Sequence, residues 1–280
     1  YTHQPASAML RSLVGSEMCI RDRNYSTNKF SRTTIYLICL FPFILGFFIP
    51  VIYIINNVFK TIDIIDFREL ITLSLNSFFL ASVSSLVIVA IAIFFQFIKK
   101  ISKSKTVFYL SEIVSLTYAL PGAVIALSLI IFLAYLTKLI GVSIAFGSII
   151  ILVYAYVMRY MAVGISPLRS SFDKHPDTFD DTGKNLGMTN FKLFKKIHLP
   201  ININSIYIAF ILCFVDIIKE LPITLILRPF NFDTLAVRTY EYAIEEMIAK
   251  SSIYSLIIIL LGAVLLIFLR KIINKGVDVS

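Results

Sequence analysis

The sequence predicts an all-α membrane protein, a polytopic bundle of about six transmembrane helices, and three observations support this class. Hydrophobic residues make up 58% of the 280 residues and charged residues only 15%, and the mean hydropathy is +0.85. A soluble domain carries roughly 25% charged residues, so this chain lacks the polar surface that water requires. Its apolar residues also form stretches long enough to cross a bilayer core of about 30 Å. A water-soluble enzyme and a disordered chain are therefore excluded as classes.

Six candidate spans follow from the length of helix that a bilayer requires, about 20 residues at about 1.5 Å each. They cover residues 35–56, 71–98, 113–136, 142–158, 203–227 and 253–269. The third contains Pro121 and Gly122, where a helix facing lipid would lose backbone hydrogen bonds. We therefore expect the third helix to pack inside the bundle. The transmembrane domain is expected to cover residues 35–270.

The first 23 residues have neither a signal-peptide core nor a lasting periodicity. They resemble translated adapter sequence, and we expect a non-native leader or a disordered tail that takes no part in the fold. If the leader is not native, the native chain begins elsewhere and can be longer. Cys39 and Cys213 lie in apolar stretches and Cys19 lies in the leader, so the three cysteines are not expected to form a disulfide framework or to have a redox role.

The distribution of lysine and arginine predicts the orientation. If the N-terminal segment 24–34 is cytoplasmic, that side also receives the acid-free run 99–105, the segment 159–202 and the tail 271–280, which together hold most of these residues. Cytoplasmic loops carry such an excess. We expect both termini to face the cytoplasm, and the net charge of +9 then reflects topology and the lipid bilayer as partner, with no role in binding nucleic acid.

The segment 159–202 is the longest expected connection and contains an amphipathic pattern. From Thr189 to His198, apolar and basic residues fall on opposite faces of a helix: Phe191, Leu193, Phe194 and Ile197 on one, Lys192, Lys195 and Lys196 on the other. Gly187 predicts a turn before this helix, and Pro200 is expected to end it. Two interpretations remain open from the residues: a helix lying on anionic lipid, or a helix docking in a groove of a soluble partner.

The spacing in this segment resembles the permease subunits of binding-protein-dependent ABC importers. Their hallmark is Glu-Ala-Ala, three residues, Gly, nine residues, Ile, one residue and Leu-Pro, and this chain has Asp181-Thr182-Gly183, Gly187, Ile197 and Leu199-Pro200 at the same spacing. The triplet departs from the hallmark, since Thr182 and Gly183 replace both alanines. A glycine weakens a helix by about 1 kcal/mol relative to alanine, so a looser first docking turn is expected.

The resemblance covers residues 71–269 and is closest to the C-terminal half of ferric-iron permeases, on the strength of segments 119–128, 215–224 and 228–238. It implies import by alternating access in the bacterial inner membrane, with a cytoplasmic ABC ATPase dimer, an extracytoplasmic substrate-binding protein and a second permease half as partners. Related branches carry thiamine, polyamines, sulfate or phosphonates. The resemblance also implies an ATPase-coupling loop formed by Asp181, Thr182, Gly183, Gly187, Phe191, Phe194, Ile197, Leu199 and Pro200.

Charged residues near the end of the fifth span predict a second site. Asp216, Lys219 and Glu220 fall near one helix face, where Lys219 can neutralise one acid, and Pro222 follows. Charges at membrane depth are costly and normally pair or face a cavity. One interpretation ends the helix near Ile218 and leaves these groups in water. The other, which the resemblance favours, places them on the translocation path or gate together with Pro121 and Gly122.

No metal site, cofactor site or catalytic residue is predicted. The three histidines are scattered, and His198 occupies the variable position of the hallmark. No glycine-rich phosphate loop is present, so ATP hydrolysis is expected in a separate subunit. Glu241, Glu245 and Glu246 are expected to form a solvated helix face. A secondary transporter with Asp216 and Glu220 as proton or sodium sites remains the alternative from a different class, and a membrane enzyme is a poorer third.

Overall fold

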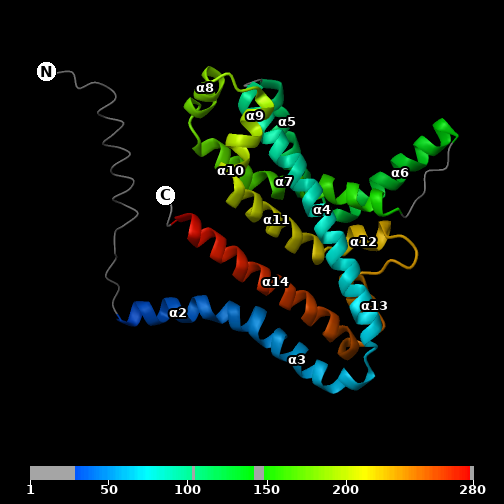
Figure 1. The fold of residues 1–280 in the computed structure, drawn as a ribbon. Coiled ribbons are helices and arrows are strands. Elements are labelled where there is room, and N and C mark those ends of the chain that lie inside the picture. Colours follow the sequence, from blue (N-terminus) through cyan, green and yellow to red (C-terminus); the bar gives the residue numbers. More distant parts are fainter. Residues whose placement is uncertain (1–28, 103–104, 142–147, 278–280) are drawn as a thin grey trace. The chain divides into compact units, whose positions relative to one another are not determined.

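A computed structural model describes residues 29–102, 105–141 and 148–277, and all the regular structure in them is helical (Figure 1). The all-α class is therefore confirmed. The predicted leader lies outside the described residues. Within these described ranges, five helices are long and apolar enough to cross a membrane, and a bent pair would make a sixth. The chain divides into two units, residues 1–52 and 53–280.

The first unit contains α2 (Lys29–Phe43), the π-helical turn η1 (Ile44–Phe48) and the start of α3 (Ile49–Thr61). This run of helix, from Thr33 to Ile64, is the first candidate span. Its large apolar side chains are exposed, as suits a helix whose surroundings are lipid. Its position agrees with the predicted span at 35–56.

The second unit holds the remaining elements. After the turn η2 (Ile62–Ile64) come α4 (Phe67–Ser102), α5 (Lys105–Leu116), η3 (Thr117–Ala119), α6 (Gly122–Ile140), α7 (Ile149–Lys174), α8 (Thr178–Asn185), α9 (Asn190–Leu193), η4 (Phe194–His198), α10 (Leu199–Ile201), α11 (Ile203–Ile218), α12 (Pro222–Leu227), α13 (Leu235–Ile244) and α14 (Ile248–Val277). The predicted spans at 71–98 and 253–269 lie within α4 and α14.

The core of this unit is the contact between α4, α7 and α11. Small residues line it: Ala92, Ala155 and Ala209 are fully buried, and a Cβ at Gly164 would lie 2.7 Å from Ile88 Cγ2. Small side chains let helices approach closely, which is how helices associate when lipid removes the hydrophobic drive between them.

The predicted third span is wrong as a single helix. The first helix, α5, ends at Leu116, and a second, α6, begins at Gly122 with Pro121 as its N-cap. Proline suits the start of a helix because its missing amide would have no partner there. The expected packing inside the bundle holds only for the start of α6, where Gly122, Ile125 and Ala126 are buried; most of the remaining side chains of α6 are exposed.

The predicted boundary between the fourth span and the segment 159–202 is wrong as well. Helix α7 continues for 26 residues to Lys174, while residues 142–147 of the predicted span lie outside the described residues. Arg159 and Arg169 do not end the helix because each finds a partner, the Leu120 carbonyl and the Glu112 carboxylate respectively. The connection between α7 and α11 is therefore shorter than expected.

The predicted fifth span is also divided. Helix α11 ends at Ile218, and α12 begins at Pro222. At its other end, α11 is preceded by the helical run Asn190–Ile201, which is inclined to it by 73°. The helix before Pro200 does not end there, contrary to the prediction, because Pro200 lies inside α10. The wider π-helical turn η4 precedes it and gives the proline ring room that an α-helical turn lacks; the break falls at Asn202.

Candidate functional site

Residues 175–202, which we call the connecting segment, contain the nine residues of the predicted coupling loop. The segment consists of α8, a turn at Gly187, and the helical run α9, η4 and α10 that leads into α11. In Figure 1 it occupies the end of the second unit opposite to α12 and α13. The two sets of predicted site residues thus lie toward opposite ends of α11.

Helix α8 presents one polar face outward and one face against η4. Asp181 and Thr182 are exposed, whereas Gly183 is buried. A Cβ at Gly183 would lie 2.9 Å from Leu193 Cδ1 and 3.3 Å from Ile197 Cδ1. The glycine that replaces alanine in the hallmark therefore allows close contact between α8 and the following helical run.

Gly187 ends α8 in a left-handed conformation, with φ of +74°. Its amide donates to the Lys184 carbonyl at 2.9 Å, and the Met188 amide donates to the Gly183 carbonyl at 3.0 Å. This pair of bonds is the Schellman arrangement, in which a left-handed glycine satisfies the last carbonyls of a helix. The predicted turn is confirmed, and glycine is required by its backbone conformation, since nothing lies within 4 Å of the position of its Cβ.

The amphipathic helix is confirmed from Asn190 onward, with one exception. Leu193 is fully buried, Phe194 and Ile197 are partly buried, and the three lysines are exposed. Phe191 was expected on the apolar face but is 73% exposed. Leu186, just before the turn, is 72% exposed. Two large apolar side chains therefore project outward on either side of Gly187.

A buried polar pair, which the sequence reasoning missed, joins α8 to η4. His198 Nε2 lies 2.7 Å from Asp180 Oδ1, and both side chains are buried. No periodic signal links positions 18 apart, and His198 was read as a variable position. Nearby, burial lowers the pKa of His175, with further lowering by His198, Lys100 and Lys174.

A second cluster gathers where two helices break, and we call Gly122, Arg159, Tyr160 and Glu220 the buried charge cluster. The Tyr160 hydroxyl donates to Glu220 Oε2, and Arg159 Nε lies 3.7 Å from the same oxygen. Arg159 Nη1 also donates to the Leu120 carbonyl at 3.0 Å. A Cβ at Gly122 would lie 2.6 Å from Glu220 Oε1 and 2.8 Å from Arg159 Nη1.

The structure thus brings together four of the residues predicted for the path or gate. Pro121 and Gly122 begin α6, Glu220 lies in the break after α11, and Pro222 begins α12. Arg159 was missed because it was counted among the cations of a loop. The expectation that these charges share one helix face is only half correct, since Glu220 is buried against α7 and not beside the other two.

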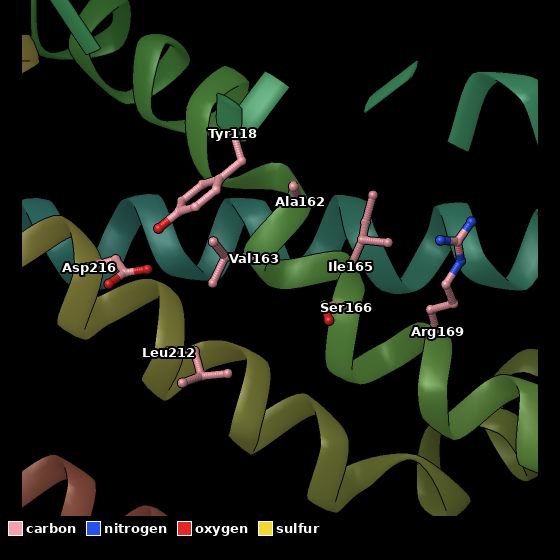
Figure 2. Close-up of a pocket in the computed structure, with 8 residues that line it drawn as sticks. All are labelled: Tyr118, Ala162, Val163, Ile165, Ser166, Arg169, Leu212 and Asp216. Atoms are coloured by element: carbon pink, nitrogen blue, oxygen red, sulfur yellow. The ribbon is translucent and has the colours of Figure 1, made fainter. Parts of the chain in front are cut away.

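Asp216 and Lys219 form a separate pair, 2.8 Å apart, and the Lys219 side chain is 60% exposed. Lys219 therefore neutralises Asp216, and the interpretation that the helix ends at Ile218 with wet charges holds for Lys219 but not for Glu220. Asp216 borders a pocket of about 530 Å³ between α7 and α11. In Figure 2 the Tyr118 hydroxyl and the Asp216 carboxylate project toward the same end of this pocket, and Arg169 lies at the other.

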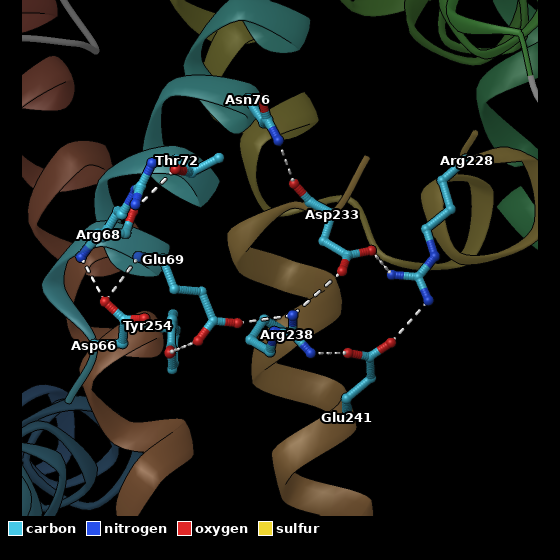
Figure 3. Close-up of polar contacts among 10 residues, drawn as sticks. All are labelled: Asp66, Arg68, Glu69, Thr72, Asn76, Arg228, Asp233, Arg238, Glu241 and Tyr254. Carbon is cyan, nitrogen blue, oxygen red and sulfur yellow. Dashed lines mark hydrogen bonds and ion pairs between the residues drawn. The ribbon is translucent and has the colours of Figure 1, made fainter. Parts of the chain in front are cut away.

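An ion network, drawn in Figure 3, joins the start of α4 to α13 and to the loop before it. In Figure 1, α13 lies at the opposite end of the second unit from α8. Arg238 contacts three carboxylates: Glu69 at 2.7 Å, Glu241 at 3.0 Å and Asp233 at 3.3 Å. Arg228 pairs with two of them. Burial acts to lower the pKa of Arg238, but the three carboxylates outweigh it and raise the pKa overall. The expectation of a solvated helix face is therefore wrong for Glu241, which belongs to this network, whereas Glu245 and Glu246 are exposed as expected.

Among the described residues, no group of three or more histidine, cysteine, aspartate and glutamate side chains could hold a metal ion. The two cysteines described, Cys39 and Cys213, are free.

The connecting segment and the buried charge cluster both lie in the part of the chain that matches a known protein family. Residues 101–279 match the family described as binding-protein-dependent transport system inner membrane component. The Fe(3+)-transport system permease protein FbpB 2 of Haemophilus influenzae is 28% identical over 207 residues, which are 74% of this chain and 40% of that protein. The chain spans about two fifths of the length of this curated relative.

Two solved structures share the fold. A bacterial alginate ABC transporter, in complex with an alginate pentasaccharide-bound periplasmic protein, matches with a TM-score of 0.70 and 14% identity, covering 88% of this chain and 94% of that chain. A bacterial ABC transporter involved in the import of alginate matches with a TM-score of 0.59 and 14% identity, covering 90% and 96%.

Proposed function

The chain belongs to the family of binding-protein-dependent transport system inner membrane components, and from this premise we propose that it is the membrane-spanning permease subunit of an ATP-driven importer. The connecting segment carries the proposal. It holds the hallmark spacing on a short exposed helix, a left-handed glycine turn and a helical run that bends by 73° into a candidate span.

The connecting segment is proposed to dock on a cytoplasmic ABC ATPase dimer. Asp181 and Thr182 are exposed on α8, and Leu186 and Phe191 project apolar side chains on either side of Gly187. Short helices with exposed apolar anchors bind in grooves on partner proteins. Closure of the ATPase on ATP would displace α8, and the contact of Gly183 with Leu193 would carry that displacement toward α11.

The helix breaks at the other end of α11 are proposed to form the gate. Interrupted helices with polar side chains at membrane depth are typical of transport pathways. The buried charge cluster holds the breaks before α6 and α12 together, and opening the gate would require Arg159 and Glu220 to separate or move together. Asp216 would line the path because it borders the pocket between α7 and α11.

Ferric iron is the proposed cargo, supported by the identity of this chain to the Fe(3+)-transport permease of Haemophilus influenzae. Other small solutes, namely thiamine, a polyamine, sulfate or a phosphonate, are the alternatives. An extracytoplasmic binding protein would deliver the cargo, and a second permease half, either fused or separate, would complete the pathway. The proposed location is the bacterial inner membrane, with both termini in the cytoplasm.

A gradient-driven secondary transporter is the second candidate, and one observation favours it. Glu220 is buried and accepts a hydrogen bond from Tyr160, an arrangement that a proton-carrying carboxylate could also use. In that case the connecting segment would lie on anionic lipid with its lysines toward the headgroups. Dependence on an ATPase separates the two candidates.

Site-directed crosslinking tests the proposal. A full-length permease with Leu186→Cys, and with Cys19 and Cys39 replaced by serine, is expressed together with an ABC ATPase from the same source. We expect a crosslink to the ATPase whose yield changes when ATP is added, because Leu186 lies beside the docking turn. Phe230→Cys is the matched control: Phe230 is fully exposed but follows α12, at the other end of α11. Labelling of lipid alone from Leu186→Cys, or equal capture from both positions, would refute the proposal.

A further inference from the structure

His198 lies where four helical elements meet. Its Nε2 atom is 2.7 Å from Asp180 Oδ1 on α8, and the two side chains are 4% and 9% exposed. Its ring stacks on Phe172 near the end of α7, with centroids 5.4 Å apart and planes at 6°. The ring of Phe97 on α4 lies 5.2 Å from it at a steep angle. One side chain therefore contacts α8, α7 and α4 from η4.

The backbone of His198 reaches the bend that begins α11. Its carbonyl accepts a hydrogen bond from the Asn202 side-chain amide at 2.7 Å and another from the Asn202 backbone amide at 3.1 Å. Asn202 is fully buried and separates the two helical runs inclined at 73°. His198 is also the last residue of a π-helical turn, a feature found frequently at functional sites.

The bond between Asp180 and His198 differs from the apolar contacts around it. Leu193 and Ile197 also touch α8, at Gly183, but apolar contacts have no preferred direction. A hydrogen bond fixes both a distance and an angle. A buried carboxylate that loses its partner is also costly. Helix α8 therefore cannot slide over η4 without either breaking this bond or moving His198.

We infer that Asp180 and His198 form a positioning pair, which transmits a displacement of α8 to the bend at Asn202 and so to α11. This inference rests on the proposed docking of α8 on an ATPase. The pair contacts neither ATP nor cargo. Its role is to make α8 and the start of α11 move as one body, through the bond on one side of His198 and the two bonds from Asn202 on the other.

Two substitutions at His198 separate this role from simple packing. His198→Phe keeps an aromatic ring between Phe172 and Phe97 but removes the hydrogen-bonding nitrogen. His198→Gln loses the ring but places an amide nitrogen near the position of Nε2, so it can still donate to Asp180. A packing role predicts that phenylalanine is the better replacement, and a positioning role predicts that glutamine is.

The experiment uses the full-length permease with its ATPase in vesicles, without Cys19 and Cys39. A reporter cysteine replaces Ile203, the exposed first residue of α11. The ATP-induced change in labelling of this cysteine by a maleimide is measured together with ATP hydrolysis. We expect His198→Phe to hydrolyse ATP while its labelling response falls at least about tenfold, the lower end of the range that corresponds to one hydrogen bond to a charged group. His198→Gln should respond like the unsubstituted protein.

Ser252→Ala is the matched control, since it removes another buried hydrogen bond, the 3.4 Å bond from Asn57, far from the connecting segment. It should respond normally. A full response from His198→Phe would overturn the inference and leave the proposed function standing. An unsubstituted permease that does not respond to ATP, and does not crosslink to the ATPase through Leu186→Cys, would overturn both.

A double variant covers the case in which His198→Phe does not accumulate in membranes. Asp180→Leu with His198→Phe replaces both partners by apolar groups, which can be nearly neutral for folding because no polar group is left unpaired. We expect this variant to accumulate and to hydrolyse ATP, but to show the same weakened response at Ile203. A double variant that responds like the unsubstituted protein would overturn the inference.

Discussion

Gly122 is the position where a single methyl group tests the geometry of the buried charge cluster. In Gly122→Ala the new Cβ would lie 2.6 Å from Glu220 Oε1 and 2.8 Å from Arg159 Nη1, well inside van der Waals contact. Both atoms end flexible side chains, but both are tethered. Tyr160 holds Glu220, and the Leu120 carbonyl holds Arg159 at 3.0 Å. The methyl group can be admitted only if at least one of these bonds is lost.

Two effects of opposite sign compete in this variant. Alanine is favoured over glycine by about 1 kcal/mol inside a helix, and less at the first helical residue. Overpacking costs about 1–3 kcal/mol, and a hydrogen bond to a charged group contributes about 1.5–3 kcal/mol. The two costs are alternatives, because loss of the hydrogen bond relieves the overlap. After a helix gain of about 0.5 kcal/mol is subtracted, we expect Gly122→Ala to lower the free energy of unfolding by about 0.5–2.5 kcal/mol.

Gly262→Ala is the matched control, because Gly262 lies inside α14 and nothing lies within 4 Å of its Cβ position. This variant should be neutral or slightly more stable. The assay is denaturant unfolding of the purified full-length protein in detergent, followed by circular dichroism. Glu220→Asp in the Gly122→Ala background, which shortens the clashing side chain, should return part of the loss. If Gly122→Ala were as stable as the unsubstituted protein or more stable, the argument that the missing side chain leaves room for Glu220 and Arg159 would be refuted.

Two further predictions concern the connecting segment. Gly187→Val should lower the free energy of unfolding by about 1–2 kcal/mol through its positive φ alone and should abolish the ATP-dependent crosslink from Leu186→Cys. Gly141→Val is its matched control, since Gly141 has φ of +73° and equally open surroundings but ends α6, and an intact crosslink in Gly187→Val would contradict the prediction. Burial, His198, Lys100 and Lys174 lower the pKa of His175 from its usual value of 6.5, so the unfolded chain binds a proton more readily than the folded one. The contribution of His175 to the free energy of unfolding should therefore be fully present above about pH 6.5 and should be lost as the pH drops through the lower folded pKa. Thermal unfolding measured between about pH 5 and 8 should show a decrease of stability toward low pH that is weaker in His175→Asn. Identical pH dependence in the two proteins would contradict this prediction.

Sequence reasoning located the two candidate sites because both leave local signals. Asp181, Gly187 and Pro200 stand at fixed spacing, and the structure places them on a helix, a left-handed turn and a helical run. Asp216 and Glu220 were visible as charges in an apolar stretch. The apolar face of the run 189–198 also followed from its period, because most of its side chains are buried within one connected segment.

The features that the sequence did not predict depend on contacts between residues far apart in the chain. The sequence places Arg159 among the cations of a loop, yet it lies inside α7 and pairs with Glu220, 61 positions later. His198 looked variable, yet it is buried against Asp180. Composition predicts where a helix can cross a membrane but not whether a proline breaks it, so the single helix expected around Pro121 was wrong. The end of α11 at Ile218 agrees with one of the two interpretations of the charges before Pro222. In each case a partner from another helix decides the outcome.

Helix α11 connects the two candidate sites, and its length determines how they can communicate. Sixteen residues span about 24 Å at 1.5 Å each. The helix is interrupted at both ends, by the bend at Asn202 and by the break before Pro222, so it can move without bending its own hydrogen-bonded backbone. Its buried face combines small side chains such as Ala209 with large ones such as Phe214, whose ring packs on Phe78 of α4, so its packing against the bundle also favours movement as one body. Under the proposed function, a displacement that enters through His198 would therefore leave at Glu220 as a rigid-body movement, and the buried charge cluster would be the part of the gate that it acts on.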